Sequence, residues 1–117
     1  MSVYQGEKSC YARKEGIYVR KARKPGIDTL GEAAAISYLI LRDLKRGYTY
    51  ENKTCRKIKM TEKTAIRRLV FLKFLARRHK APKDIIHAVD YLVEYVIKHQ
   101  KLPSGKVVKL AKKMIAS

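Results

Sequence analysis

The chain has 117 residues, of which 46% are hydrophobic, and its 28 Lys and Arg outnumber its 10 Asp and Glu to give a net charge of +18. This length suits one domain, and the hydrophobic fraction supports a packed core, so the composition excludes a disordered chain. No apolar run is as long as a bilayer span, and the first residues lack the apolar core of a signal peptide. We therefore expect a protein of the cell interior rather than a secreted one, without a membrane span.

The excess of positive charge is the most informative property of the composition. A compact particle that carries +18 repels itself, and a polyanion relieves this repulsion. A membrane partner would require an apolar anchor or a segregated amphipathic helix. Nucleic acid is therefore the partner that best explains the charge.

The two cysteines, Cys10 and Cys55, are too few and too far apart for a disulfide framework or a zinc site. The simplest expectation is a pair of buried or free thiols. Asn and Gln are scarce and charged residues are abundant, a profile that resembles proteins of hyperthermophiles. In such a protein an intracellular disulfide stays open as an alternative.

Residues 1–27 are predicted to be an extended basic arm, because they contain few aliphatic residues, three glycines and a Pro-Gly break. Tyr4, Tyr11 and Tyr18 are seven positions apart, so in a helix they would lie along one stripe. The glycines oppose a stable isolated helix, and we expect the arm to become ordered only on its partner. We expect the tyrosines to fill an interface between protomers rather than to stack on bases, and a frayed tail with accidental spacing is the alternative.

Residues 28–117 are predicted to form an all-α domain, a small bundle of about four helices. Thr29 with Glu32 forms a capping box, and Thr61 and Ser104 are further N-cap candidates. Residues 48–60 break the helical period; they fit a small hairpin or a basic loop, and we favour the loop. The predicted helices cover residues 29–46, 61–80, 83–99 and 105–115.

The charge is unevenly divided among these segments. Two of the helical segments are nearly neutral, and the excess is confined to the arm, the loop, the second helix and the C-terminal helix. This division is typical of neutral packing elements that support basic surfaces on several sides. The net charges are +5 for residues 1–27, 0 for 28–47, +3 for 48–60, +6 for 61–80, −1 for 81–100 and +5 for 101–117.

These basic segments predict contacts to phosphates rather than to base edges, because Asn and Gln are scarce and Lys outnumbers Arg. A charge of +18 would neutralise the phosphates of about nine base pairs of duplex. This number of base pairs per protein chain is typical of a packaging protein. The second helix is apolar around much of its circumference, which predicts self-association as a dimer or a larger array. The expected phosphate contacts are Arg13, Lys14, Arg20, Lys21, Arg23, Lys24, Arg56, Lys57, Arg67, Arg68, Arg77, Arg78, Lys109, Lys112 and Lys113.

The motifs of the common enzyme classes are missing. The chain has no phosphate-binding glycine loop, no zinc-protease motif, no paired Cys-x-x-Cys and no nucleophile elbow. His79, His87 and His99 are not spaced to converge on a metal, and Asp90 with Glu94 would need further ligands. We expect no enzyme activity, no cofactor and no metal.

The layout of a basic N-terminal arm before a compact helical bundle resembles the major coat proteins of rod-shaped and filamentous viruses of hyperthermophilic archaea. This resemblance implies helical protomers that dimerise and wrap double-stranded DNA in a filament, and it implies that the protein is part of a virion. The layout also resembles, less closely, the small helical subunits of CRISPR effector complexes, and a ribosomal or chromatin-type protein is a third option. A helix-turn-helix regulator that uses residues 105–115 as its recognition helix is a further alternative. We favour duplex DNA as the ligand, and RNA stays open as the alternative.

Overall fold

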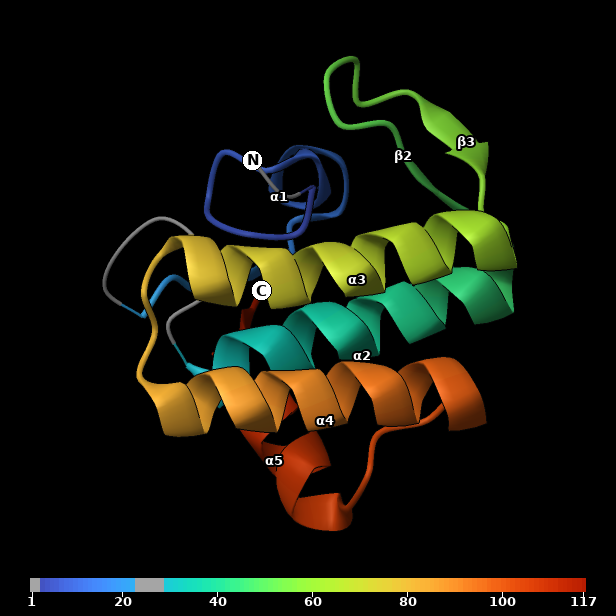
Figure 1. Ribbon diagram of the computed structural model, residues 1–117. Helices are drawn as coiled ribbons and strands as arrows, with labels where there is room; N and C mark the ends of the chain where they lie inside the picture. Colours follow the sequence, from blue (N-terminus) through green and yellow to red (C-terminus); the bar gives the residue numbers. More distant parts are fainter. Residues whose placement is uncertain (1–2, 23–28) are drawn as a thin grey trace.

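The computed structural model describes residues 3–22 and 29–117, and the described part is mostly helical (Figure 1). The predicted helices are confirmed, with ends that shift by no more than two residues. Two short antiparallel strand pairs and one additional helix accompany them. The helices are α1 (Cys10–Glu15), α2 (Leu30–Arg46), α3 (Glu62–Arg78), α4 (Lys83–His99) and α5 (Gly105–Met114), and the strands are β1 (Tyr18–Val19), β2 (Tyr48–Tyr50), β3 (Lys57–Lys59) and β4 (Ile115–Ala116).

The long helices begin where local capping signals place them. The hydroxyl of Thr29 accepts a hydrogen bond from the Glu32 amide at 3.3 Å, as the capping box predicts. Thr61 and Ser104 cap α3 and α5 in the same manner. α2 ends at Gly47, whose φ of 90° is a left-handed conformation that favours glycine.

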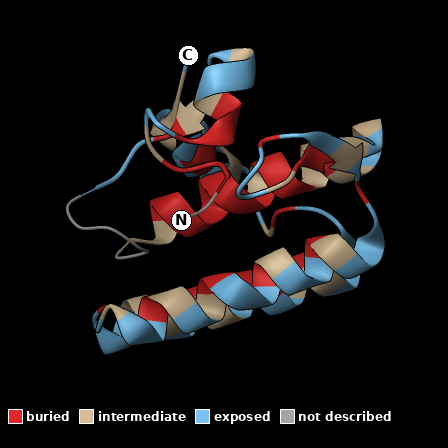
Figure 2. Ribbon diagram, turned by 90° about the horizontal axis from the view of Figure 1, so that it is seen from above, coloured by how far each residue is buried: buried red, intermediate tan, exposed pale blue. Residues whose placement is uncertain are grey.

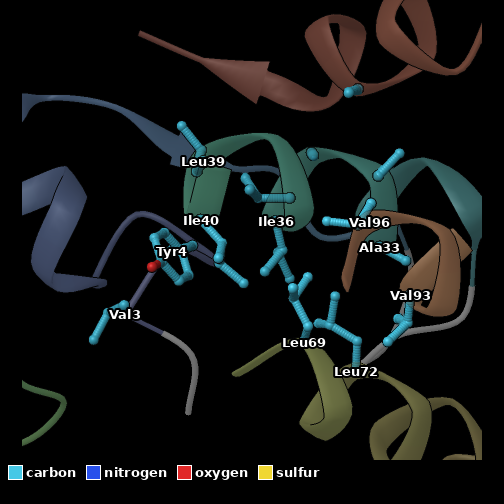
Figure 3. Packing of buried hydrophobic residues seen from close by; sticks show 14 of the residues in the cluster. Val3, Tyr4, Ala33, Ile36, Leu39, Ile40, Leu69, Leu72, Val93 and Val96 are labelled. Atoms are coloured by element: carbon cyan, nitrogen blue, oxygen red, sulfur yellow. The ribbon is translucent and has the colours of Figure 1, made fainter. Parts of the chain in front are cut away.

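α2 is the central helix of the fold. Almost all of its first ten residues are buried, and it contacts α3, α4 and α5. α3 and α4 form an antiparallel pair along one side of α2, and the outward surface of this pair is exposed (Figure 2). Ile36, Leu69 and Val93 represent the apolar layer where these three helices meet (Figure 3). This layer is the core that holds the basic elements in place.

The N-terminal segment, residues 3–22, is folded against α2, so the prediction of an extended arm that stays unordered without a partner was wrong. Tyr4 and Tyr11 are 1% and 0% exposed, and their rings stack with centroids 4.9 Å apart. Tyr4, Tyr11 and Tyr18 do not lie along one helix, because Tyr11 belongs to α1 and Tyr18 belongs to β1. The physical reason is that Gly6, with φ of 84°, lets the chain turn back, so that two aromatic rings are buried within the protomer rather than between protomers.

The two ends of the described chain are joined by a short strand pair. Tyr18 is opposite Ala116 and Val19 is opposite Ile115 in the antiparallel ladder of β1 and β4. Val19 also makes a parallel bridge to Gln5. Backbone hydrogen bonds therefore tie the N-terminal segment to the end of α5.

The segment between α2 and α3 is a hairpin, so the preference for a plain basic loop was wrong. β2 and β3 pair with Thr49 opposite Ile58, and Thr49 is fully buried. The expectation of free thiols was also wrong, because Cys10 and Cys55 form a disulfide with Cα atoms 5.3 Å apart. Contact with the N-terminal segment stabilises this hairpin, which its own short strands could not do alone.

Candidate nucleic-acid interface

α5 presents a row of lysines to solvent. Lys106, Lys109 and Lys113 are three or four positions apart, so they share one face of the helix, and Lys112 lies beside them. All four side chains are exposed. Residues 101–117 contain no Asp or Glu, so no carboxylate of the same segment neutralises this row.

A close approach between α2 and α5 fixes the direction of this lysine row. A Cβ atom on Gly31 of α2 would lie 3.1 Å from Met114 Cγ and 3.4 Å from Leu110 Cγ. Because glycine has no side chain, the apolar side of α5 can pack directly on α2 at this point. The opposite side of α5, which carries the lysines, therefore faces outward.

The strand pair at the chain ends adds one further cation to this surface. The Arg20 guanidinium donates a hydrogen bond to the carbonyl oxygen of Lys113, and the Arg20 amide donates to the carbonyl oxygen of Met114 at 2.8 Å. Lys21 follows directly and is exposed, but its Cε lies beside Gly6, 3.1 Å from where a Cβ atom on that glycine would be. We name the following residues the α5 basic surface: Arg20, Lys106, Lys109, Lys112 and Lys113.

A second group of cations gathers where α1 meets the hairpin. The Arg13 guanidinium donates to the Cys55 sulfur at 2.9 Å, so Arg13 lies beside the disulfide. Arg56 makes an exposed ion pair with Glu51 at 3.6 Å, and Lys57 Nζ lies 3.9 Å from the centroid of the Tyr48 ring. The hairpin and α5 lie at opposite edges of the molecule in Figure 1. The residues of the hairpin basic surface are Arg13, Lys14, Arg56 and Lys57.

The expected contacts on α3 have different environments. Arg67 is exposed, whereas Arg77 forms a bidentate ion pair with Asp90 at 2.9 and 2.5 Å. Arg78 is exposed and lies 6.0 Å from the Phe74 ring centroid. Arg23 and Lys24 lie outside the described residues.

Arg68 is oriented into the molecule, which differs from its predicted place on a phosphate-binding face. Its guanidinium donates to Tyr4 Oη at 2.8 Å, to Thr49 Oγ1 at 2.7 Å and to the Tyr50 carbonyl oxygen at 2.8 Å. These bonds join α3 to the N-terminal segment and to β2. Its donors are therefore used within the fold, and we no longer count Arg68 among the candidate contacts.

These bonds belong to a polar network centred on Asp43, which is fully buried. Its Oδ2 accepts hydrogen bonds from Tyr4 at 3.0 Å, from Thr49 at 2.8 Å and from Tyr11. Arg46 lies 3.2 Å from Oδ1. Burial raises the pKa of the Asp43 carboxyl, although the hydroxyl donors and Arg46 oppose this shift.

Raising the pH above 10 should unfold the protein through its buried tyrosines. Burial raises the pKa of Tyr50 to about 12 and raises the pKa of Tyr4 and of Tyr11 as well. The unfolded chain releases these protons near pH 10 while the folded chain keeps them, so the free energy of unfolding falls as pH rises. Tyr4 and Tyr11 should each contribute a loss of about 1.4 kcal/mol per pH unit. Tyrosinate absorbance and circular dichroism, recorded together along the titration, measure this effect.

The exposed Tyr91 supplies the control for this titration. Its side chain is 62% exposed, so Tyr91→Phe should leave the alkaline unfolding midpoint unchanged, whereas Tyr11→Phe should change the number of tyrosines that titrate only on unfolding. Titration of all eight tyrosines near pH 10 with intact helical signal would contradict the prediction.

The sequence did not reveal the roles of Asp43, Arg46 and Glu15. These residues form a buried or half-buried ionic cluster and do not belong to a basic surface. Glu15 accepts from Arg46 at 2.8 Å and from Arg42 at 3.2 Å, and these arginines, opposed by burial, hold its pKa below the ordinary value.

The described residues contain neither a candidate metal site nor a candidate membrane span. Residues 3–22 and 29–117 contain no group of three or more His, Cys, Asp or Glu side chains placed to hold a metal ion, and no helix within those ranges is long and apolar enough to cross a membrane.

No protein-family model matches the chain, and comparisons with curated proteins and with solved structures give no match either.

Proposed function

We propose that the protein binds nucleic acid through the phosphate backbone, without sequence preference, and packages it as an array of copies, with duplex DNA as the favoured ligand. The observation that carries this proposal is the α5 basic surface, where exposed cations follow one another with no carboxylate in residues 101–117. The protein acts in this proposal as a binding protein and not as an enzyme.

The distribution of carboxylates supports the same proposal. Glu32 and Asp43 are fully buried, and Glu15 is bonded to two arginines. These three acids therefore stabilise the fold and offset little of the field at the surface. Arg42, Arg46 and Arg68 are likewise bonded within the fold, so the remaining surface keeps the excess of positive charge, which favours a polyanionic partner.

The chemistry of the exposed cations favours phosphates over bases. Lys109 and Lys113 present flexible ammonium groups, which act as point charges on phosphates and carry little sequence information. The hairpin and α5, which carry the two basic surfaces, lie at different edges of the molecule (Figure 1). Such an arrangement suits coating of a strand better than insertion of one helix into a groove.

Removing two lysines from α5 should weaken binding to every sequence by a similar factor. Each lost phosphate contact reduces the slope of log K against log salt concentration by about 0.9, so Lys109→Ala with Lys113→Ala should reduce it by about 2. The matched control is Lys83→Ala with Lys98→Ala, which removes the same charge from exposed positions of α4 and should change the slope less. Fluorescence anisotropy with labelled duplexes of several sequences over a salt series gives these slopes.

The same experiment separates the alternatives. A loss confined to one duplex sequence would favour a helix-turn-helix regulator, and tighter binding to RNA would favour a ribonucleoprotein subunit. Equal slopes for both double variants, or no binding at physiological salt, would contradict the proposal.

A further inference from the structure

α3 exposes apolar side chains on the side that faces away from the core. Val70, Phe71 and Phe74 are 49%, 44% and 54% exposed, although Leu69 and Leu72 on the inner side are buried. The two phenylalanine rings stack with centroids 5.8 Å apart. Exposed large apolar side chains gathered in this way indicate a binding surface. We define the α3 outer face by its six outward residues: Lys63, Arg67, Val70, Phe71, Phe74 and Arg78.

The order of these residues along α3 is self-complementary. The midpoint between Lys63 and Arg78 falls between Val70 and Phe71. If a second α3 lay antiparallel over that midpoint, Val70 would meet Phe71 of the second copy. Such a two-fold contact repeats every pairing twice, as an isologous interface requires.

The pairings beyond this apolar centre have opposite effects. Arg67 would meet Phe74 of the second copy, a cation–π pair worth about 0.5–1 kcal/mol at an exposed site. At each end of the contact, Lys63 would meet Arg78 of the second copy, and these like charges repel. The contact is therefore attractive at its centre and repulsive at its ends.

The carboxylates of α4 cannot relieve this repulsion without losing their present partners. Asp90 is held by Arg77, and Glu94 accepts from Lys73 at 3.4 Å. The area is also small, because a helix of 17 residues is about 25 Å long and about 10 Å wide, well below the roughly 800 Å² per partner of a stable interface. A pair of copies should therefore be weak while the end cations are unscreened.

We propose that a second copy of this chain docks antiparallel on the α3 outer face, and that salt or a polyanion strengthens the pair by screening Lys63 and Arg78. The part played by nucleic acid rests on the proposed function, whereas the pairing itself does not. Paired copies would present two α5 basic surfaces to one strand, which would couple binding to assembly. The dependence on salt is the distinguishing feature, because ionic strength should weaken phosphate binding and strengthen this contact.

Sedimentation equilibrium without nucleic acid tests the pairing directly. At high protein concentration, the apparent mass should rise from near 13.5 kDa at low salt toward twice that value at high salt. Phe71→Ser should abolish the rise, and Tyr91→Ser, which removes an exposed ring from α4, should preserve it. Inorganic polyphosphate at low salt should reproduce the effect of high salt.

A charge reversal provides a gain-of-association test. Lys63→Glu converts each repulsive end pair into an attractive one, so this variant should pair at low salt without any polyanion. Lys98→Glu on α4 makes the same change in net charge at an exposed position away from the α3 outer face and should stay monomeric at low salt.

Three results would overturn the proposal: an unchanged mass across the salt series, equal masses for the two charge variants, or a rise caused only by single-stranded oligonucleotides. The last result would mean that the phenylalanine rings stack on bases instead of on a second copy. Failure of the phosphate-binding proposal would appear separately, in the anisotropy experiment on the α5 lysines.

Discussion

Reduction of the Cys10–Cys55 disulfide should lower the free energy of unfolding by about 4 kcal/mol. The bond closes a loop across 45 residues, and the chain-entropy relation assigns a loop of this length about 4 kcal/mol at 25 °C. Since small domains are stable by only about 5–15 kcal/mol, reduction should remove a large part of the total. Urea unfolding with and without a thiol reductant, followed by circular dichroism, measures the difference.

The double variant Cys10→Ser with Cys55→Ser is the control for this measurement. It should match the reduced protein in stability and should not respond to the reductant. Equal midpoints for the oxidised and reduced wild type would contradict the prediction. Because Arg13 donates a hydrogen bond to the Cys55 sulfur, loss of the disulfide should also make the residues of the hairpin basic surface more mobile.

Replacing Asp43 by alanine should destabilise the protein by about 3–5 kcal/mol. The substitution leaves the hydroxyl groups of Tyr4, Tyr11 and Thr49 without their common acceptor, and it removes the carboxylate beside Arg46. Breaking a buried ion pair from one side has a cost in this range, because the remaining charge stays buried without its partner. Chemical denaturation monitored by circular dichroism gives the change.

Two further variants make this test specific to the network. Asp43→Asn retains one acceptor oxygen and should lose less stability than Asp43→Ala. Asp84→Ala removes an exposed carboxylate from the first turn of α4 and should cost no more than about 1 kcal/mol, the size of its interaction with the helix dipole. A loss from Asp43→Ala as small as that from Asp84→Ala would show that the network contributes little.

The four predicted helices, α2 to α5, could be recognised because their signals are local, whereas the short α1 was missed. Thr29, Thr61 and Ser104 each lie directly before an amphipathic stretch and cap it through a hydrogen bond within three residues. Such a bond depends on neighbours in the sequence, and no distant partner is needed to recognise it. The lysine row of α5 was predictable for the same reason, since helical periodicity alone separates it from the apolar side.

The hairpin and the disulfide were not predictable in this way. β2 and β3 have three residues each, and the turn between them lacks an Asn-Gly or Asp-Gly pair. The hairpin is held by the bond from Cys55 to Cys10. Only the folded structure brings those two positions together.

Arg68 shows why a charged residue on a basic helix need not face a ligand. Its partners include Tyr4, which is 64 positions away in the sequence, and a hydroxyl at that distance leaves no periodic pattern around Arg68. Composition indicated an excess of cations correctly, but it could not separate the arginines that hold the fold together from those at the surface.

The ladder between β1 and β4 bears on how the chain is made. Arg20 and its bonding partner Lys113 are separated by 93 residues, so during translation the N-terminal segment emerges from the ribosome long before the strand it pairs with. α2, α3 and α4 can associate in the meantime, because their contacts are closer in sequence. Closure of the ladder has to wait until β4 is made, so it is expected to be a late event in folding.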